Sequence, residues 1–285
     1  MRVLVVGSGG REHAILWKLK QSPKVTELYC APGNGGISEI AQLVPINATD
    51  IKGIVSFSKE NQIDLVVVAP DDPLAAGMVD ALLGEGIRAF GPVKRAAVIE
   101  ASKVFSKNLM KKYNIPTADY EVFDNSSEAK EYIKTASYPL VVKADGLALG
   151  KGVIICNNEK EALDAISSIM EDNKFGSAGQ KIVIEEFIAG PEVSVLAFTD
   201  GKTIVPMISS QDHKRAFDGD KGLNTGGMGT LAPSRYYTEA IHKKCMETIY
   251  LPTINAMNSE GRPFKGVLFF GLMLTDKGPK VLEYN

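Results

Sequence analysis

The last six residues place two oxygen-bearing side chains two positions apart. In Lys280-Val281-Leu282-Glu283-Tyr284-Asn285, a single residue separates the carboxylate of Glu283 from the amide of Asn285. If this run forms a β-strand, both side chains lie on one face, because side chains alternate along a strand. Two oxygen ligands on one face suit a Mg²⁺ ion that keeps some waters and also binds phosphate oxygens. The run therefore predicts a metal site at Glu283 and Asn285.

A glycine-rich run, Gly146-Leu147-Ala148-Leu149-Gly150-Lys151-Gly152, indicates a place where phosphate binds. It is one residue shorter than the P-loop motif and lacks the Ser or Thr that would meet magnesium. Apolar runs at residues 140–143 and 152–156 flank it, so we expect a flap between antiparallel strands whose N–H groups close over phosphates. Lys143 ends the first strand, and its ammonium either finds a partner there or reaches out to solvent.

A second glycine loop, Gly7-Ser8-Gly9-Gly10-Arg11-Glu12, follows an apolar run and opens a helix. Free N–H groups at a helix start favour an anion. A dinucleotide site is disfavoured, because Glu12 stands where the third glycine belongs and the second strand ends in Tyr29-Cys30-Ala31 without a ribose-binding acid. The loop predicts a phosphate-bearing small molecule; the alternative is a tight turn that serves packing alone.

In the first hundred residues, apolar runs alternate with helical patterns across short links. Asp50 is placed to cap one of these helices. The expected strands are residues 3–6, 25–30, 63–69 and 87–90, and the expected helices are residues 11–21, 51–61 and 73–83. This alternation predicts an α/β domain with a parallel, doubly wound sheet.

Beyond residue 100 the pattern changes. Ser102 can cap a helix that runs to Tyr113, and two turn signals, Thr199-Asp200-Gly201-Lys202 and Thr275-Asp276-Lys277-Gly278, predict hairpins. The expected strands are residues 139–143, 152–156, 181–187, 193–198, 203–208, 268–274 and 280–283, with a helix at 159–170. Hairpins with helices on one face predict an α+β domain. Residues 210–230 have little apolar pattern, so we expect a long functional loop there.

Composition narrows the class of partner. The 285 residues suffice for roughly two domains. With 34 acidic against 32 basic residues, the chain has neither a nucleic-acid footprint nor a polybasic membrane patch. No apolar run is long enough to span a membrane, and the N-terminus lacks the features of a signal peptide. Cys30, Cys156 and Cys245 show no paired spacing, which indicates core residues in a reducing compartment. We expect a cytoplasmic monomer with small-molecule partners.

Five stretches in this order and spacing resemble the phosphoribosylamine–glycine ligase (glycinamide ribonucleotide synthetase) family of ATP-grasp enzymes, over essentially the whole chain. They are Gly9-Gly10-Arg11-Glu12-His13-Ala14, Pro70-Asp71-Asp72-Pro73-Leu74-Ala75-Ala76-Gly77, Lys143-Ala144-Asp145-Gly146-Leu147-Ala148, Gln211-Asp212-His213-Lys214-Arg215 and Asn224-Thr225-Gly226-Gly227-Met228-Gly229. Each motif is weak alone, whereas the ordered set is specific.

The resemblance implies a substrate-binding α/β domain at residues 1–101 and an ATP-grasp domain at 102–285. The latter would comprise a small flap-bearing lobe at 118–188 and a larger lobe at 189–285 that is incomplete at its C-terminus. It also implies ligation of glycine to phosphoribosylamine through a glycyl phosphate, with ATP and Mg²⁺ or Mn²⁺, in purine biosynthesis. A carboxylate must be phosphorylated before an amine can displace its oxygen, so the protein supplies charge, metal and positioning.

The resemblance assigns roles to individual residues. Lys103 and Lys143 would contact ATP phosphates, with Gly150 and Lys151 in the flap. Adenine would meet Glu185, Glu186, Phe187 and Ile188, with Glu185 or Glu186 accepting from its amino group, and Glu192 would hold the ribose. The expected catalytic residues are Asp212, Lys214 and Arg215, and the expected metal ligands are Glu283 and Asn285. The expected substrate-binding residues are Gly9, Gly10, Arg11, Asp71, Asp72, Asn224, Thr225, Gly226, Gly227 and Met228.

The chain departs from the family in a few places. Leu223 stands where Pro is usual, and Thr230-Leu231 replaces an Ala-aromatic pair. The family continues beyond the position of Asn285 with an Arg-containing extension and a C-terminal domain, so we expect a truncated form that is inactive by itself. The rival interpretations are another ATP-grasp ligase or carboxylase, an NAD-dependent oxidoreductase, and a non-catalytic nucleotide-binding regulator.

Overall fold

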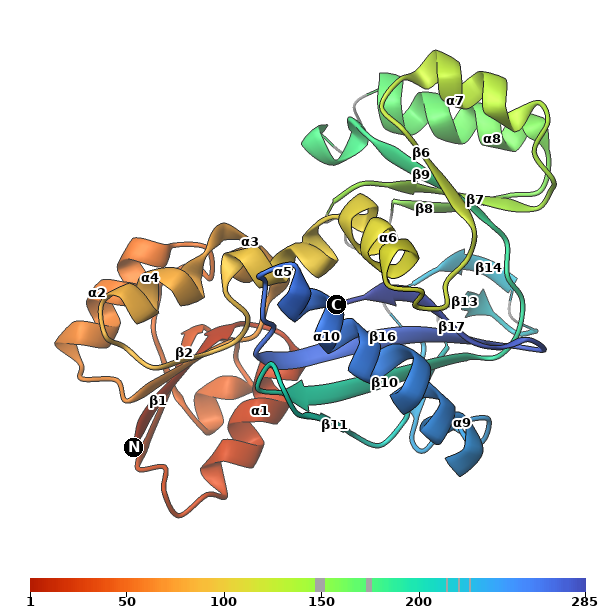
Figure 1. Ribbon diagram of the computed structural model, residues 1–285. Helices are drawn as coiled ribbons and strands as arrows, with labels where there is room; N and C mark the ends of the chain where they lie inside the picture. The colour runs from red at the N-terminus through yellow and green to blue at the C-terminus, as the bar shows by residue number, and fades with distance from the viewer. Residues whose placement is uncertain (147–151, 173–175, 214, 220, 226) are drawn as a thin grey trace. The chain divides into compact units, whose positions relative to one another are not determined.

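The computed structural model describes the chain except for residues 147–151, 173–175, 214, 220 and 226. It forms two compact units (Figure 1). The first unit contains Met1–Ala97 and Phe264–Gly266, and the second contains Val98–Pro263 and Val267–Asn285. Each unit has its own sheets and is described by itself.

The first unit contains a five-stranded sheet in which every pair is parallel, with the order β3-β2-β1-β4-β5. Its strands are β1 (Arg2–Gly7), β2 (Glu27–Pro32), β3 (Gln42–Leu43), β4 (Leu65–Val68) and β5 (Ala89–Phe90). Leu4 and Val6 of β1 pack into one core, and Val3 and Val5 pack into another on the opposite face. Burial on both faces explains the continuous apolar runs, and the predicted parallel, doubly wound sheet is confirmed.

Helices of the first unit follow the strands. They are α1 (Gly10–Lys20), α2 (Ile51–Glu60), α3 (Asp71–Ala76), α4 (Met78–Gly84) and the short 3-10 helix Ile37–Glu39. The Asp50 carboxylate accepts from the Gly53 N–H at 2.9 Å, which confirms the predicted cap. The single helix predicted at residues 73–83 is wrong: Gly77 adopts φ +101°, a left-handed conformation that ends α3 before α4 begins. Helix α5 (Lys94–Ala101) leads into the second unit.

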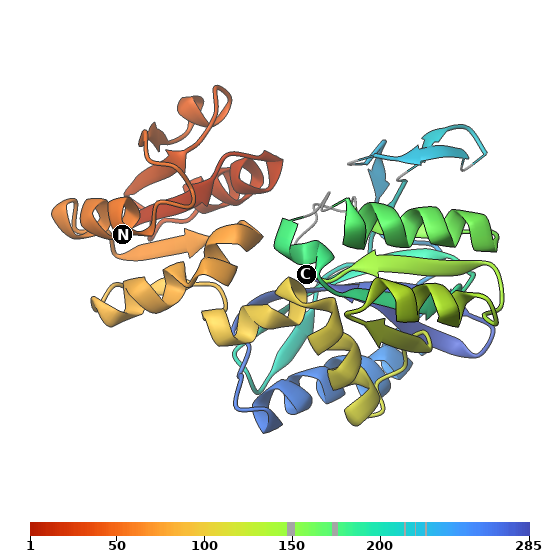
Figure 2. The same cartoon turned by 90° about the horizontal axis from the view of Figure 1, so that it is seen from above.

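The first helix that lies wholly in the second unit is α6 (Lys103–Lys112). Its start is capped as predicted by Ser102, whose Oγ accepts from the Phe105 N–H at 3.0 Å. A four-stranded antiparallel sheet follows, with the order β6-β9-β7-β8 (Figure 1). Its strands are β6 (Tyr120–Phe123), β7 (Leu140–Ala144), β8 (Val153–Cys156) and β9 (Ile182–Glu186). Helices α7 (Ser126–Ile133) and α8 (Glu159–Ile166) pack on one face (Figure 2), and short helical turns lie at Ser167–Glu171 and Gly176–Gly179. The opposite face carries Lys143 and Glu185.

The larger sheet of the second unit has the order β11-β10-β16-β17. Its strands are β10 (Glu192–Thr199), β11 (Ile204–Pro206), β16 (Gly266–Thr275) and β17 (Gly278–Tyr284), and both predicted hairpins are confirmed. The accompanying helices are α9 (Glu239–Cys245), the π-helical turn Met246–Tyr250 and α10 (Leu251–Ser259). The ring of Phe270 lies 4.6 Å from that of Tyr250, a contact that fixes the helical layer to the sheet, and 5.6 Å from that of Tyr284 on the neighbouring strand.

The predicted irregular loop at residues 210–230 contains two short antiparallel ladders. Strand β12 (Gln211–Asp212) pairs with β15 (Thr230–Leu231), and β13 (Arg215–Phe217) pairs with β14 (Lys221–Asn224). These strands are too short and polar to show an apolar alternation, which is why the sequence did not reveal them.

All three cysteines are buried and free, as the sequence indicated. Burial raises the pKa of the Cys30 and Cys156 thiols to about 11. Within the part of the chain that the structure describes, no helix combines the length and apolar character that crossing a membrane requires.

Candidate active site

A carboxylate held by two lysines lies buried in the second unit. Val141 pairs with Glu185 across β7 and β9, and Lys143 pairs with Val183 two positions along. Lys143 and Glu185 are therefore diagonal neighbours on one face, and their ion pair measures 3.0 Å between Nζ and Oε2. Lys107, from α6, reaches the same Oε2 at 3.1 Å. The sequence placed Lys143 and Glu185 in one site, and the structure brings them together.

The second carboxylate oxygen of Glu185 is buried and, among the described residues, has no hydrogen-bond partner. A buried acceptor left unpaired costs about 1–3 kcal/mol, so such an atom needs an explanation. A donor supplied by a ligand would satisfy it. The side chain of Glu185 is only 3% exposed, so the donor would have to come from a bound molecule that reaches into the protein.

Lys107 was not predicted as a site residue. Besides Glu185, its Nζ donates to Thr117 Oγ1 at 2.8 Å and to the Ala118 carbonyl at 3.1 Å. The pKa of Lys107 is lowered to about 8: burial is the main cause, the Glu185 carboxylate opposes the shift, and the nearby Lys143 ammonium adds to it. The sequence did contain a signal, since Lys103 and Lys107 are four residues apart on a predicted helix and so share a face.

Lys143 and Lys103 extend this cluster toward β17. Lys143 Nζ donates to the Leu282 carbonyl at 3.3 Å, and Lys103 Nζ donates to the Gly146 carbonyl at 2.8 Å. Burial lowers the pKa of Lys103, and the nearby Glu283 carboxylate partly offsets this. Lys143 is 7% exposed and ion-paired, so the alternative in which it reaches solvent is wrong. Two cations predicted to contact phosphates thus converge near the predicted metal strand.

The carboxylate of Asp145, directly after β7, holds the beginning of the glycine-rich segment against the start of α6. Asp145 accepts from Ser102 Oγ at 3.0 Å and from the Val104 N–H at 3.1 Å. These bonds tie the segment after β7 to the helix that carries Lys103 and Lys107. Gly150 and Lys151, predicted in the flap, lie outside the described residues.

The predicted metal ligands lie at the end of β17. Glu283 stands opposite Gly271 of β16, where a Cβ would come within 3.0 Å of Glu283 Cγ, so the glycine leaves room for the carboxylate. Asn285 continues the pairing, and its N–H donates to the Phe269 carbonyl at 3.1 Å. In the described ranges, no group of three or more His, Cys, Asp or Glu side chains could hold a metal. One carboxylate and one amide nevertheless suit a Mg²⁺ ion that takes its other ligands from phosphate and water.

The predicted nucleotide-binding residues that follow Glu185 in the chain differ in their partners and in their exposure to solvent. Glu186 pairs with Lys280 at 2.7 Å and accepts from the Asp119 N–H at 3.2 Å, and the bond from Lys280 lowers the pKa of Glu186. Phe187 is 40% exposed, Ile188 is half-buried, and Glu192 begins β10.

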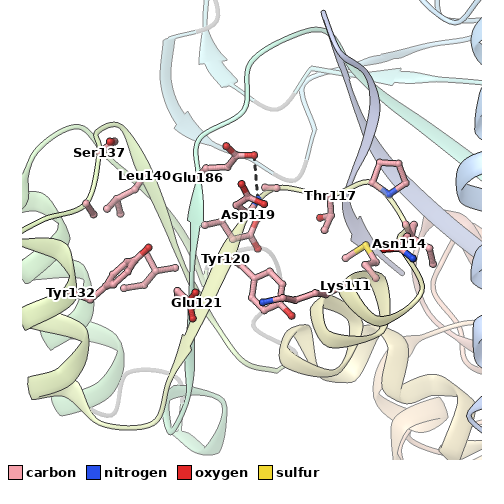
Figure 3. Close-up of a pocket in the computed structure, with 17 residues that line it drawn as sticks. Lys111, Asn114, Thr117, Asp119, Tyr120, Glu121, Tyr132, Ser137, Leu140 and Glu186 are labelled. Carbon is pink, nitrogen blue, oxygen red and sulfur yellow. Dashed lines mark hydrogen bonds between the residues drawn. The ribbon is translucent and has the colours of Figure 1, made fainter.

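A pocket of about 800 Å³ adjoins this region (Figure 3). Residues from the end of α6, the 114–119 segment, β6, α7, β7 and β9 line it, and the side chain of Tyr132 lies on the side opposite Lys111. Of the predicted nucleotide-binding residues, only Glu185 and Glu186 are among those lining it. Thr117 and Ala118, to which Lys107 donates, also line it, so the pocket borders the buried ion pair of Lys107 and Glu185.

In the first unit, predicted substrate residues meet where β1 and β4 end. The Arg11 guanidinium and Asp71 lie 3.7 Å apart, which joins the two loops at the point where strand order reverses. Asp72 follows in the first turn of α3. Glu12 is buried, and its Oε2 accepts from the Gly9 N–H at 2.5 Å. A Cβ at Gly7 would lie 2.6 Å from Glu12 Cγ, so an acidic side chain fills the space beneath this loop.

The predicted catalytic and substrate residues of the 210–230 segment are partly described. Asp212 Oδ1 accepts from Thr230 Oγ1 at 3.4 Å, and Thr225 Oγ1 accepts from the Gly227 N–H at 3.1 Å. The backbones of Arg215 and Asn224 pair across β13 and β14, and Met228 is exposed. Lys214 and Gly226 lie outside the described residues.

Comparisons with known proteins cover the whole chain. The family model described as "Phosphoribosylglycinamide synthetase, N domain" matches residues 1–100, and the one described as "Phosphoribosylglycinamide synthetase, ATP-grasp (A) domain" matches residues 101–285. A phosphoribosylamine–glycine ligase of Halalkalibacterium halodurans is 51% identical over 285 residues, which are 100% of this chain and 67% of that protein. One of Clostridium acetobutylicum is 49% identical, over 100% of this chain and 68% of that protein.

Solved structures give the same result. The crystal structure of phosphoribosylamine–glycine ligase from Thermotoga maritima matches with a TM-score of 0.86 and 36% identity, over 100% of this chain and 68% of that one. The biotin carboxylase domain of 2-oxoglutarate carboxylase from Hydrogenobacter thermophilus matches with a TM-score of 0.76 and 17% identity, over 100% and 63% of the chains, which is a likeness of fold alone. The chain thus spans about two thirds of the length of these relatives.

Proposed function

Because this chain belongs to the phosphoribosylglycinamide synthetase family, we propose that it carries the sites for ATP-dependent ligation of glycine to 5-phosphoribosylamine. The products are glycinamide ribonucleotide, ADP and phosphate, in de novo purine biosynthesis. The match of both family domains over residues 1–285 carries this proposal. The work is divided between a substrate-binding domain at residues 1–101 and an ATP-grasp domain at 102–285, with lobes at 118–188 and 189–285.

The buried cluster of the second unit forms the nucleotide site in this proposal. Lys103 and Lys143 neutralise the phosphates of ATP, and Gly150 and Lys151 belong to the flap that covers them. The unpaired Oε1 of Glu185 accepts from the exocyclic amino group of adenine, a role for which Glu186 is less suited because it already binds Lys280. The backbone at residues 186–188 meets the purine edge, and Glu192 holds the ribose hydroxyls.

The reaction proceeds in two steps, phosphorylation of glycine and then attack by the amine. A carboxylate oxygen of glycine attacks the γ-phosphorus of ATP, the bond to the β-phosphate oxygen breaks, and ADP leaves. The amine of phosphoribosylamine then attacks the carbonyl carbon of glycyl phosphate, phosphate leaves, and the nitrogen loses a proton. Because no covalent enzyme intermediate is needed, the side chains contribute positive charge and orientation.

Residues outside the cluster hold the other two substrates. Arg215 can fork the glycine carboxylate or the acyl phosphate, Lys214 adds charge, and Asp212 orients the incoming amine. Substrate also contacts residues of the 224–228 loop, namely Asn224, Thr225, Gly226, Gly227 and Met228. In the first unit, Gly9, Gly10 and Arg11 bind the phosphate of phosphoribosylamine, and Asp71 and Asp72 bind its sugar hydroxyls or its amine. Because the Gly9 N–H already donates to Glu12, Gly9 contributes close approach of the backbone rather than a donor, and the Arg11 guanidinium is the main ligand of the phosphate.

Glu283 and Asn285 would hold the magnesium or manganese ion, which neutralises phosphate charge when bound. We also propose that the protein acts as a monomer in the cytoplasm, with small molecules as its partners. Light scattering after size-exclusion chromatography tests the monomer, and cell fractionation tests the location.

Calorimetric titration of this chain with ATP and Mg²⁺, repeated with NAD, tests the proposal. We expect saturable ATP binding that requires Mg²⁺, and no heat with NAD. A matched titration of the Glu283→Gln variant should need a higher Mg²⁺ concentration for the same ATP binding, because one anionic ligand is lost. Tight NAD binding without ATP binding would instead support an oxidoreductase and refute the proposal.

A further inference from the structure

Glu185 forms ion pairs with two lysines, Lys107 and Lys143. If the proposed function is right, Lys143 turns from Glu185 to the phosphates when ATP binds. We propose that Lys107 is a positioning residue: it is the permanent counter-ion of Glu185, and it keeps the Oε1 atom of that carboxylate aimed at the amino group of adenine. Lys107 would thereby set the preference for 6-amino purines without touching the nucleotide.

The surroundings of Lys107 hold it in place. Its side chain is 3% exposed, and its Nζ binds the hydroxyl of Thr117 and the carbonyl of Ala118 in addition to Glu185. The Thr117 hydroxyl in turn donates to the Val281 carbonyl at 2.7 Å, and the Val281 N–H donates to the Pro116 carbonyl at 2.8 Å. These bonds anchor the segment to β17, so Lys107 cannot follow a ligand without breaking three contacts.

Lys143 is held less firmly. Apart from Glu185, the partner of its Nζ within the described part of the chain is the Leu282 carbonyl at 3.3 Å, beside Glu283. It lies on β7, which leads into the glycine-rich segment through Asp145. A phosphate oxygen could replace the carbonyl and the carboxylate as its partners. Without Lys107, that exchange would leave Glu185 as a buried charge with no counter-ion, which is strongly unfavourable.

The consequence concerns which purine is accepted. An ionised Glu185 accepts a hydrogen bond from a 6-amino group and repels the 6-oxo group of guanine or hypoxanthine, which offers another acceptor. Sites built around one hydrogen bond reject analogues that lack it, because a buried polar group is left unpaired. If Glu185 lost its fixed partner, it would rotate or take up a proton, and the selectivity would fall.

The test compares ATP with purine riboside 5′-triphosphate, which lacks the 6-amino group, by calorimetry in the presence of Mg²⁺. The selectivity ratio is the dissociation constant of purine riboside triphosphate divided by that of ATP. Because Glu185 is a charged acceptor, this ratio should be on the order of 10 to 100 in the native chain. In the Lys107→Met variant it should fall below about three. Lys107→Arg, which keeps the charge, should restore most of it.

Lys111→Met is the matched control. Lys107 Nζ and Lys111 Nζ lie 5.4 and 5.5 Å from the centre of the Tyr120 ring, on the same helix. The control therefore removes one lysine from the same ring without removing an ion pair to Glu185, and its ratio should stay at the native value. If Lys107→Met does not fold, Lys107→Gln can keep the bonds to Thr117 and Ala118 while losing the charge, and its ratio should also fall.

The Glu185→Met variant, which has no oxygen to accept from the amino group, separates the two possible failures. If the native chain binds both nucleotides equally, or if Glu185→Met keeps the native ratio, the proposed role of Glu185 in the nucleotide site is wrong. If Glu185→Met loses the ratio while Lys107→Met or Lys107→Gln keeps it, only the role of Lys107 is refuted. Loss of the ratio in Glu185→Met and in the uncharged Lys107 variants, with retention in Lys111→Met, supports the inference.

Discussion

The loop between β9 and β10 contains a glycine that no other residue should replace. Gly190 adopts φ +153°, and a Cβ on it would lie 2.2 Å from the backbone oxygen of Leu274 and 2.9 Å from the Leu274 carbonyl carbon. The neighbouring Pro191 carbonyl accepts from the Leu274 N–H at 3.0 Å. Gly190→Ala must therefore move the loop away from β16 by about 1 Å, since an ordinary Cβ contact is longer than 3.4 Å.

Two costs set the expected magnitude. The backbone conformation disfavours any L side chain, at about 1–3 kcal/mol. Moving the loop also weakens or breaks the bond between Leu274 and Pro191, which contributes about 1 kcal/mol. We expect Gly190→Ala to lower the free energy of unfolding of the second unit by about 2–4 kcal/mol, since both costs act together.

Urea denaturation followed by circular dichroism measures this change. The matched control is Gly261→Ala in the same unit, where φ is +66° and no atom lies within 4 Å of the added Cβ. That change should cost about 1 kcal/mol, from conformation alone. If the two variants unfold at the same urea concentration, the close approach of Gly190 to Leu274 does not constrain this loop, and the reasoning fails.

Three further predictions concern the charged cluster. Lys143→Met should weaken ATP binding by roughly 10- to 100-fold and AMP binding much less, because Lys143 acts on the terminal phosphates; equal losses in calorimetry would contradict this. Glu283→Gln should raise the Mg²⁺ concentration needed for half-maximal ATP binding at least about fivefold, because one anionic ligand is lost; an unchanged Mg²⁺ titration would refute the metal assignment. The pKa of Lys107 is about 8 in the folded chain and 10.5 as an ordinary lysine, so between these pH values the unfolded chain binds more protons than the folded one, and the free energy of unfolding rises with pH. Urea titrations at several pH values should show this rise, of at most about 3 kcal/mol, in the native chain and not in Lys107→Met. If the rise persists in the variant, other groups cause it.

Local patterns in the sequence determined most of the elements. The apolar runs around Val3–Val6 and Val66–Val68 predicted parallel strands because both of their faces are buried. Asp50 and Ser102 marked helix starts, since a cap depends on residues only three positions away. The hairpin signals were equally local. Family motifs then indicated which of these residues form the sites, and the match of both family domains supports the fold and the family.

Other features depend on tertiary structure. The break at Gly77 and the ladders of residues 211–231 follow from packing and pairing that no short apolar pattern specifies. The pairing of Lys107 with Glu185 joins a helix to a strand distant in the sequence, and only the packing of α6 against β9 brings them within 3.1 Å. Sequence determines the elements because helix and strand preferences are set by near neighbours. The partners of a buried charge are decided by the fold, because desolvation and ion pairing depend on distances that exist only after the chain has packed.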